Sequence, residues 1–420
     1  MPSNYKRLGD YIHKVENRNR DLKVSNLVGL SMTKEFRVST SNIVGTDMSV
    51  YKVVNKWQFS CDFMSVIRVH KFPVVLKTDD EPVLVSPAYT VFEINDENEL
   101  NPEYLMMWFR RSEFDRYADF KCDSAIRGGF DWDALCDCML PIPSIEKQQE
   151  LVREYNTIQN RIALNNQLIS KLEETAQAIY KQWFVDFEFP FSDTEALEVT
   201  EKPKGYKSSG GKMVWCEELE KEIPEGWELG NLTTIANYKN GLAMQKFEPI
   251  EGEDYLPVIK IRELNIGKTD INSNRCIKEI PDEIFIKNGD IIFSWSGSLL
   301  VDIWVGGNGG LNQHLFKVTS KKVEKWFYYL ATKFHLEEFI RIADGNKTSL
   351  GHIKKEHLEN AEVFLPKNEQ LINMNKLMNP FIENLIYKKL ETQKLEELKE
   401  LLLAKMTRVE SEKETNYKKN

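Results

Sequence analysis

The sequence lacks long apolar runs and paired cysteines. No stretch approaches the roughly 20 apolar residues that cross a bilayer, so we expect no membrane partner. Residues 1–10 are polar and contain no apolar signal-peptide core. The 6 cysteines are scattered, and none has the CxxC spacing of a zinc site. These absences predict a reduced, cytoplasmic protein without a metal site.

Motifs for catalysis are missing as well. Residues 306–310, Gly-Gly-Asn-Gly-Gly, are not followed by the Lys-Ser/Thr pair of a phosphate-binding loop. His352 and His357 lack the HExxH arrangement of zinc hydrolases. Residues 101–104, Asn-Pro-Glu-Tyr, depart from the Asn-Pro-Pro-aromatic motif of amino-methyltransferases. The sequence therefore predicts a binding protein with no catalytic residue and no cofactor.

The net charge of −9 is unusual for a protein that binds nucleic acid. The acidic excess is not concentrated in the globular parts, because residues 1–140 carry 18 basic and 21 acidic groups and residues 201–365 carry 22 and 25. DNA binding depends on a local basic face and not on the total charge. The charge balance thus leaves DNA open as a ligand but argues against tight binding by the isolated chain.

The chain contains an internal repeat with a period of 223 residues. Pro143 recurs as Pro366, and Leu172 recurs as Leu395, each at this same spacing. Each copy consists of a globular head followed by a long helical segment. A duplicated unit of this kind predicts a two-headed reader with approximate twofold symmetry.

The helical segments carry heptad seams, with apolar residues at alternating spacings of four and three. A twofold axis would make the helices antiparallel and would place Asn165 near Thr392 and Lys388 near Ile169. The first seam comprises Leu151, Tyr155, Ile158, Ile162, Asn165, Ile169, Leu172, Ala176, Ile179 and Trp183. The second comprises Met374, Met378, Phe381, Leu385, Lys388, Thr392, Leu395, Lys399, Leu402 and Met406.

The seams allow two interpretations. The 33 residues from Leu151 to Trp183 would span roughly 50 Å as a helix, so heads at its ends could reach DNA sites one turn, about 34 Å, apart. A plain coiled-coil hairpin that presents two duplicated heads to protein partners fits the same pattern. The helices alone do not separate a DNA reader from an interaction scaffold.

The heads are expected to be mixed α and β. Strand-like runs lie at residues 50–54, 83–94, 256–261 and 290–295, and amphipathic helices at residues 102–114 and 323–339. The predicted fold class is α+β, with two similar mixed heads joined by two long antiparallel coiled-coil helices. The boundaries are a first head at 1–140, a first spacer helix at 141–190, a linker at 191–226, a second head at 227–365, and a second spacer helix with tail at 366–420.

Several short sequence motifs carry a family resemblance through their order along the chain and their duplication. They are Leu140-Pro141-Ile142-Pro143, residues 85–92, residues 172–187, Glu222-Ile223-Pro224-Glu225-Gly226-Trp227, residues 288–294 and Leu311-Asn312-Gln313-His314-Leu315. With them the chain resembles, over nearly its whole length, the specificity subunit of a type I restriction–modification enzyme.

The resemblance implies that each head is a target-recognition domain for one half of a bipartite double-stranded DNA sequence, and that helix length sets the gap. It also implies that the helices hold two methyltransferase subunits, that nuclease/translocase subunits complete the complex, and that this chain contributes no catalytic residue. The alternatives are the interaction scaffold and a self-sufficient nuclease or methyltransferase. Footprinting of the assembled complex separates the DNA reader from the scaffold, because a scaffold protects no split site. Adenine methylation or cleavage by the lone subunit would favour the self-sufficient enzyme.

Base and phosphate contacts call for basic or amide side chains on exposed loops. In the first head the candidates are Lys34, Arg37, Lys52, Arg68, Lys71 and Arg127, and in the second they are Lys239, Asn240, Gln245, Lys246, Lys260, Arg262, Gln313 and Lys347. Trp295 and His314 are expected to support strands. The candidates for partner docking on the first helix are Gln148, Gln149, Gln159, Gln167 and Gln177.

Overall fold

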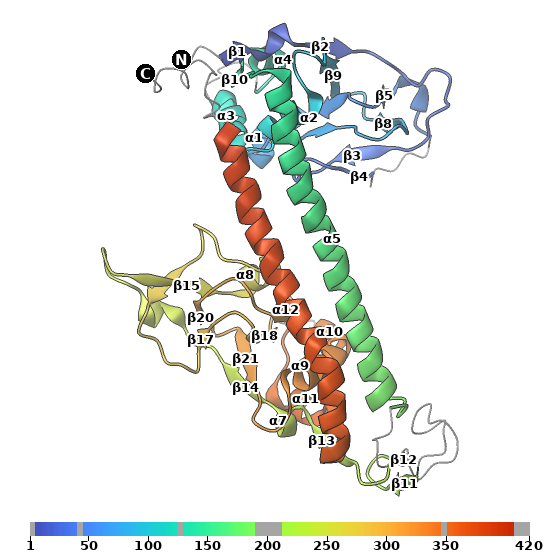
Figure 1. Cartoon of the computed structure of the whole chain (residues 1–420), viewed down its shortest axis with the longest axis vertical. Helices are drawn as coiled ribbons and strands as arrows, with labels where there is room; N and C mark the ends of the chain where they lie inside the picture. The colour runs from blue at the N-terminus through green and yellow to red at the C-terminus, as the bar shows by residue number, and fades with distance from the viewer. Residues whose placement is uncertain (1–4, 40–44, 124–128, 190–211, 346–350, 407–420) are drawn as a thin grey trace, which may run out of the picture. The chain divides into compact units, whose positions relative to one another are not determined.

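The computed structural model describes residues 5–39, 45–123, 129–189, 212–345 and 351–406 (Figure 1). The chain forms two compact units, residues 1–162 with 394–420 and residues 163–393. Two long helices, α5 (Ile145–Phe184) and α12 (Asn368–Lys405), each contribute to both units. None of the described helices has the length and apolar composition that crossing a bilayer requires.

The first unit contains a head built on a four-stranded antiparallel sheet. Its strand order is β2 (Ile12–Val15), β9 (Thr90–Ile94), β6 (Phe59–Cys61), β7 (Val74–Leu76). Three two-stranded ladders accompany it: β1 (Tyr5–Arg7) with β10 (Met139–Pro141), β3 (Val28–Leu30) with β4 (Phe36–Val38), and β5 (Lys52–Val54) with β8 (Val83–Val85). The helices are α1 (Val66–Val69), α2 (Pro102–Phe109), α3 (Ser112–Asp123) and α4 (Trp132–Cys136), with 3-10 turns η1 (Leu8–Asp10) and η2 (Met48–Val50).

Phenylalanine rings form the centre of this head. Phe59 and Phe92 stack with their centroids 4.8 Å apart, and Phe109 meets both rings edge-on. Such pairs add about 0.5–1.5 kcal/mol each beyond burial. Helix α2 delivers Phe109 because Asn101 caps its first turn by accepting from the backbone N–H of Tyr104, and Pro102 occupies its first position.

The second unit contains a head with the same central sheet. Its strand order is β14 (Asn237–Asn240), β21 (Leu315–Thr319), β18 (Ile291–Ser294), β19 (Leu300–Ile303). A second four-stranded sheet has the order β16 (Arg275–Ile277), β15 (Tyr255–Ile259), β20 (Gly309–Leu311), β17 (Phe285–Ile286). Two two-stranded ladders accompany it: β13 (Glu228–Asn231) with β22 (Glu362–Leu365), and β11 (Met213–Cys216) with β12 (Lys221–Pro224). The helices are α7 (Leu232–Ile235), α8 (Ile261–Ile266), α9 (Lys325–Phe334), α10 (Leu336–Gly345) and α11 (Lys355–Asn360), with η3 (Met244–Phe247).

The two heads repeat one topology. In both, the first strand of the central sheet pairs with the last, the last with the second, and the second with the third, all antiparallel. In both, two helices and a short helix follow, and the strand before the long helix pairs with the strand that opens the head. The duplication predicted from the sequence is therefore a duplication of structure, and the predicted fold class is confirmed.

The long helices pair antiparallel inside each unit. In the first unit, Tyr155 and Ile158 of α5 share a buried core with Leu402 of α12. In the second unit, Tyr180 near the end of α5 shares a core with Met378 near the start of α12. The start of one helix therefore packs with the end of the other, as the seams predict.

Polar residues interrupt this seam where they were expected. Asn165 is fully buried and Thr392 is 9% exposed, and the polar atoms of both side chains have no hydrogen-bond partner among the described residues. Lys388 instead forms an ion pair with Glu391 on its own helix, with a distance of 2.7 Å between Nζ and Oε2. Buried polar groups at seam positions reduce stability while fixing register.

Three sequence predictions differ from the structure in detail. The run at 83–94 forms two strands, because Pro87 cannot donate to a ladder and lies in the turn between β8 and β9. Each predicted amphipathic helix, at 102–114 and at 323–339, is two consecutive helices. The hairpin β11–β12 lies inside the segment 191–226 that was predicted to be a linker.

Candidate nucleic-acid interface

One edge of the central sheet of the second head gathers amide, imidazole and indole side chains. Strands β14 and β18 both run antiparallel to β21, so the ends of the first two meet the start of the third. The residues at these ends form what we call the edge cluster: Asn240, Trp295, Ser296, Gln313, His314 and His352.

Trp295 is the centre of the edge cluster. The centroid of its ring lies 6.0 Å from that of His314 and 6.3 Å from that of His352. Its Nε1 donates to Oδ1 of Asn240 at 3.0 Å. The backbone is tied down as well, because the N–H of Ile353 donates to the carbonyl of Trp295 at 3.0 Å. Trp295 thus supports the polar groups around it, as expected from the sequence.

Gln313 and His314 form the exposed rim of the edge cluster. His314 Nδ1 lies 3.1 Å from the Oγ of Ser296, and its Nε2 lies 3.4 Å from Nε2 of Gln313. None of the six side chains is a carboxylate, in a chain with a net charge of −9. Amide groups read base edges in the major groove, and aromatic rings stack on bases. The edge cluster therefore has the chemistry of a base-reading surface.

A glycine permits the close approach on which this edge depends. Gly241 follows Asn240 directly, and a Cβ at this position would lie 2.2 Å from the carbonyl oxygen of Asn312. Any other residue would push the end of β14 away from the loop that carries Gln313. The sequence motif around Gln313 and His314 indicated that this loop belongs to a binding site. No sequence pattern predicted that Ser296 or His352 would lie beside it.

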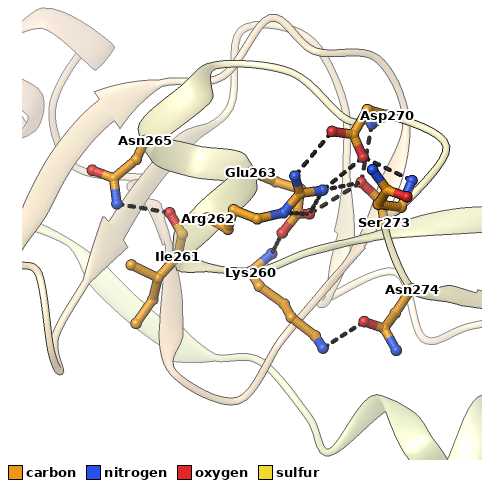
Figure 2. A network of polar contacts seen from close by, with 9 residues as sticks. Lys260, Ile261, Arg262, Glu263, Asn265, Asp270, Ser273 and Asn274 are labelled. Atoms are coloured by element: carbon orange, nitrogen blue, oxygen red, sulfur yellow. Dashed lines mark hydrogen bonds and ion pairs between the residues drawn. The ribbon is translucent and has the colours of Figure 1, made fainter. Parts of the chain in front are cut away.

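A second polar network surrounds α8 (Figure 2). Arg262 binds Asp270 through two hydrogen bonds, Nη1 to Oδ2 at 2.9 Å and Nη2 to Oδ1 at 2.7 Å. Its Nε donates to Oε1 of the buried Glu263 at 3.0 Å, and Ser273 donates to the same oxygen at 3.0 Å. The hydrogen bond from Arg262 lowers the pKa of Asp270 to about 2, and Asp270 raises the pKa of Arg262.

Arg262 is 45% exposed and stays a prediction as a DNA contact. Its guanidinium also binds Asp270 and Glu263, so it orders the loop after α8. Nζ of Lys260 donates to Oδ1 of Asn274 at 2.6 Å, again within the network (Figure 2). A Cβ at Gly297 would lie 3.6 Å from Cδ1 of Ile261, which places the start of α8 beside the edge cluster.

The other predicted residues of the second head differ in exposure. Gln245 and Lys246 are exposed on η3. Lys239 is half-buried and forms an ion pair with Glu283. Lys347 lies outside the described residues.

Two of the basic residues predicted to bind DNA in the first head are buried. Lys34 is 4% exposed, and its Nζ donates to the carbonyl of Phe109 and to Oδ1 of Asp115, the latter at 2.8 Å. Burial lowers the pKa of Lys34, and the charge of Asp115 opposes this shift. Lys52 is 7% exposed and pairs with Glu16, with 3.2 Å between Nζ and Oε1. Both lysines hold the head together, which corrects the prediction that they reach DNA.

Arg37, Arg68 and Lys71 remain as exposed candidates on the first head, and Arg127 lies outside the described residues. Burial raises the pKa of Tyr89, Asp62 raises it further, and Arg37 lowers it, so both charges lie close to this phenol. Tyr89 precedes β9 as His314 precedes β21. The first head thus has polar and charged groups at the equivalent edge of its sheet.

The helix glutamines were predicted as docking residues, and two of the five are engaged inside the protein. Gln148 is fully buried; its Oε1 accepts from the N–H of Asn101 at 2.8 Å, and its Nε2 donates to the carbonyls of Glu99 and Pro143 at 2.9 Å each. Gln177 donates to the carbonyl of Leu330 at 3.4 Å.

Burial of Gln148 corrects its prediction, because this side chain fastens the start of α5 to the first head. Gln177 is half-buried, its Oε1 has no partner among the described residues, and its role in docking stays a prediction. Gln159 is half-buried, and its Oε1 has no partner among the described residues. Gln149 and Gln167 are exposed.

A charged cluster fastens α5 and α12 to the second head. Oε2 of Glu173 lies 2.7 Å from Nζ of Lys333 on α9, and Oε1 lies 3.4 Å from Nζ of Lys389 on α12. Lys389 also pairs with Asp302 on β19. Burial alone would raise the pKa of Glu173, but Lys389 and Lys333 together lower it.

Comparison with known proteins places this architecture in a class. The family model described as "Type I restriction modification DNA specificity domain" matches residues 224–400. The chain is 24% identical over 314 residues to the specificity subunit of the type I restriction enzyme MjaIX of Methanocaldococcus jannaschii, covering 72% of this chain and 68% of that protein. It is 23% identical over 375 residues to the HindI specificity subunit of Haemophilus influenzae, covering 78% and 81%.

The fold agrees with these relatives. The crystal structure of the type I restriction–modification S subunit from M. genitalium aligns with a TM-score of 0.54 at 13% identity, over 97% of this chain and 96% of that one. Over residues 224–400 the chain matches the type I restriction–modification DNA specificity domain, and over most of its length it is similar to specificity subunits of type I restriction enzymes.

Proposed function

We propose that each head reads one half of a bipartite double-stranded DNA target and that the paired helices dock two methyltransferase subunits. The repeated topology of the heads carries this proposal, because two copies of one reader on one chain call for two related places on the duplex. Nuclease/translocase subunits join to complete the restriction enzyme, and the assembly acts in the cytoplasm.

The surfaces described above supply the contacts. In the second head the edge cluster faces base edges. Phosphates are bound by Gln245 and Lys246 on η3, Lys260 at the start of α8 and Lys239 on β14. In the first head Arg37, Arg68 and Lys71 fill both roles. On α5 the exposed amides of Gln149 and Gln167 belong to the docking surface for methyltransferase. Because both heads are close to neutral, we expect weak binding to DNA until the partner subunits add their own positive surface.

The test is to assemble the chain with the methyltransferase subunits of its own host and to map methylated adenines by sequencing. We expect a split motif with a fixed gap. Replacing residues 227–365 by the second head of another family member should change one half of that motif and leave the other half and the gap unchanged. A complex that methylates or protects no split site, or a swap that alters both halves, would contradict the proposal.

A further inference from the structure

The edge cluster contains a feature that bears on which base the second head reads. We propose that Gln313 reads an adenine in the major groove, and that His314 and Ser296 fix the orientation of its amide so that guanine is rejected. This proposal rests on the proposed function and adds to it the identity of one base in the half-site of the second head.

The orientation of the Gln313 amide follows from the donors and acceptors that surround it. Nε2 of Gln313 carries only hydrogens, so the contact of 3.4 Å with Nε2 of His314 requires that imidazole nitrogen to accept. In the neutral imidazole the other nitrogen, Nδ1, then carries the proton and donates to the Oγ of Ser296 at 3.1 Å. Because a hydroxyl can accept as well as donate, the Oγ of Ser296 can receive this proton and stabilises the tautomer that the contact with Gln313 requires, while His314 holds the nitrogen end of the glutamine amide.

The remaining groups of the amide match adenine. One hydrogen of Nε2 is used by His314, while the other hydrogen and Oε1 have no partner among the described residues, and Gln313 is exposed. Adenine offers N7 as an acceptor and the N6 amino group as a donor along its major-groove edge. The free edge of the amide offers the complementary donor and acceptor side by side.

Guanine does not match the amide in this orientation. Its major-groove edge presents two acceptors, N7 and O6. One of them would face Oε1, and the amide cannot rotate to offer a second donor without breaking its contact with His314. A bidentate contact of this kind discriminates by roughly 5- to 150-fold between the right and the wrong base.

The rest of the edge cluster keeps this pair in place. The ring of His314 packs beside Trp295, whose Nε1 is itself held by Asn240. Ser296 forms a β-bridge with His352, so the hydroxyl that stabilises the tautomer belongs to a paired backbone segment. His314 and Ser296 are therefore positioning residues, whereas Gln313 makes the contact with the base.

The experiment uses the full chain assembled with its methyltransferase subunits, with methylation motifs mapped by sequencing for each variant. We expect the wild-type half-site of the second head to contain an adenine whose requirement is lost in Gln313→Ala, by roughly 5- to 150-fold, with every other position unchanged. His314→Ala frees the amide to rotate, so the same position should accept adenine or guanine. Ser296→Ala should show part of this relaxation, and Ser296→Thr, which keeps the hydroxyl, should restore selectivity.

Asn98→Ala is the matched control, because it removes an exposed amide of the first head that bonds only to Asp96 among the described residues. It should leave the second half-site unchanged. Competition binding at one fixed salt concentration, with duplexes that carry A or G at the position in question, gives a second readout that is independent of methylation.

The outcomes separate this inference from the function on which it rests. If the wild-type complex recognises no split site, the proposed function fails and the base assignment fails with it. If the split site is present but Gln313→Ala changes no position, Gln313 does not read a base and only the further inference is overturned. It is also overturned if the position that relaxes is a guanine in the wild type, because reading guanine would require both hydrogens of Nε2 to face the base, and one of them is bound to His314.

Discussion

Replacement of Gln148 by alanine tests whether this residue fastens the start of α5 or binds a partner. The change would leave three partly buried backbone groups without their partner: the N–H of Asn101 and the carbonyls of Glu99 and Pro143. A fully buried unpaired group costs about 1–3 kcal/mol. Because water can still reach these partly buried groups, each should cost near the lower end of that range, and we expect Gln148→Ala to lower the free energy of unfolding by about 3–5 kcal/mol in total. This corresponds to a drop in Tm of roughly 6–20 °C for a unit of this size.

The measurement is chemical and thermal unfolding of the full chain, with Gln149→Ala as the control. Gln149 is the exposed neighbour on the same helix, so its replacement should change stability by no more than about 0.5 kcal/mol. Gln148→Glu should destabilise strongly at neutral pH, because it aims a carboxylate at two carbonyls. That penalty should shrink as the pH falls from the raised folded-state pKa towards the unfolded value of about 4.3, since the protonated acid can donate again. The reasoning would be refuted if Gln148→Ala were as stable as Gln149→Ala and lost only the binding of methyltransferase.

Three further predictions concern the charged cluster, the first head and the spacer. Because the pKa of Glu173 is lowered in the folded state, its stabilising contribution is complete above about pH 4.3 and is lost as the pH falls through the folded-state pKa. Glu173→Gln leaves Lys389 short of a partner and should lower the free energy of unfolding by about 1–3 kcal/mol at pH 7. Urea unfolding at several pH values should then show a smaller loss of stability at acidic pH in the variant than in the wild type. Lys34→Ala should destabilise the first head by about 3–5 kcal/mol, because the mostly buried carboxylate of Asp115 would lose its ion-pair partner and keep only the N–H of Phe72. Lys71→Ala should leave stability unchanged and reduce the salt dependence of DNA binding. Equal effects of the two changes on unfolding would contradict the buried role of Lys34. A heptad inserted after Thr175, matched by a heptad in α12, adds about 10 Å of helix. It should lengthen the gap of the methylated motif or abolish methylation, while both half-sites keep their sequences. An altered half-site sequence would contradict the idea that helix length sets the gap.

The sequence predicted the parts of the fold that depend on local periodicity. A heptad seam is a pattern of neighbours three and four residues apart, so Leu151 and Tyr155 could be assigned to a buried face without knowledge of what covers it. The repeat at 223 residues required only that the chain be compared with itself. It predicted two heads of one topology, which the matching strand orders confirm.

The same reasoning assigned the heads less well in detail, because turns depend on single residues. Pro87 divides a continuous apolar run into β8 and β9, and the hairpin β11–β12 arises in a segment whose composition is that of a linker. The two strands of this hairpin stabilise each other by pairing, and the sequence of one strand does not show that the other will pair with it.

By itself, the amino-acid sequence determined that this protein has two related heads and paired long helices. Only the tertiary structure decided which polar side chains are available to DNA. Lys34 and Arg262 are indistinguishable from surface charges in the sequence, yet Asp115 removes the first from any ligand, and Asp270 and Glu263 bind the second. The reverse holds for Ser296, which became part of the edge cluster only when β18 and β21 aligned. The physical reason is that a charge or a hydrogen-bonding group acts on whatever lies within a few ångströms, and for a buried or edge residue those neighbours come from distant parts of the chain.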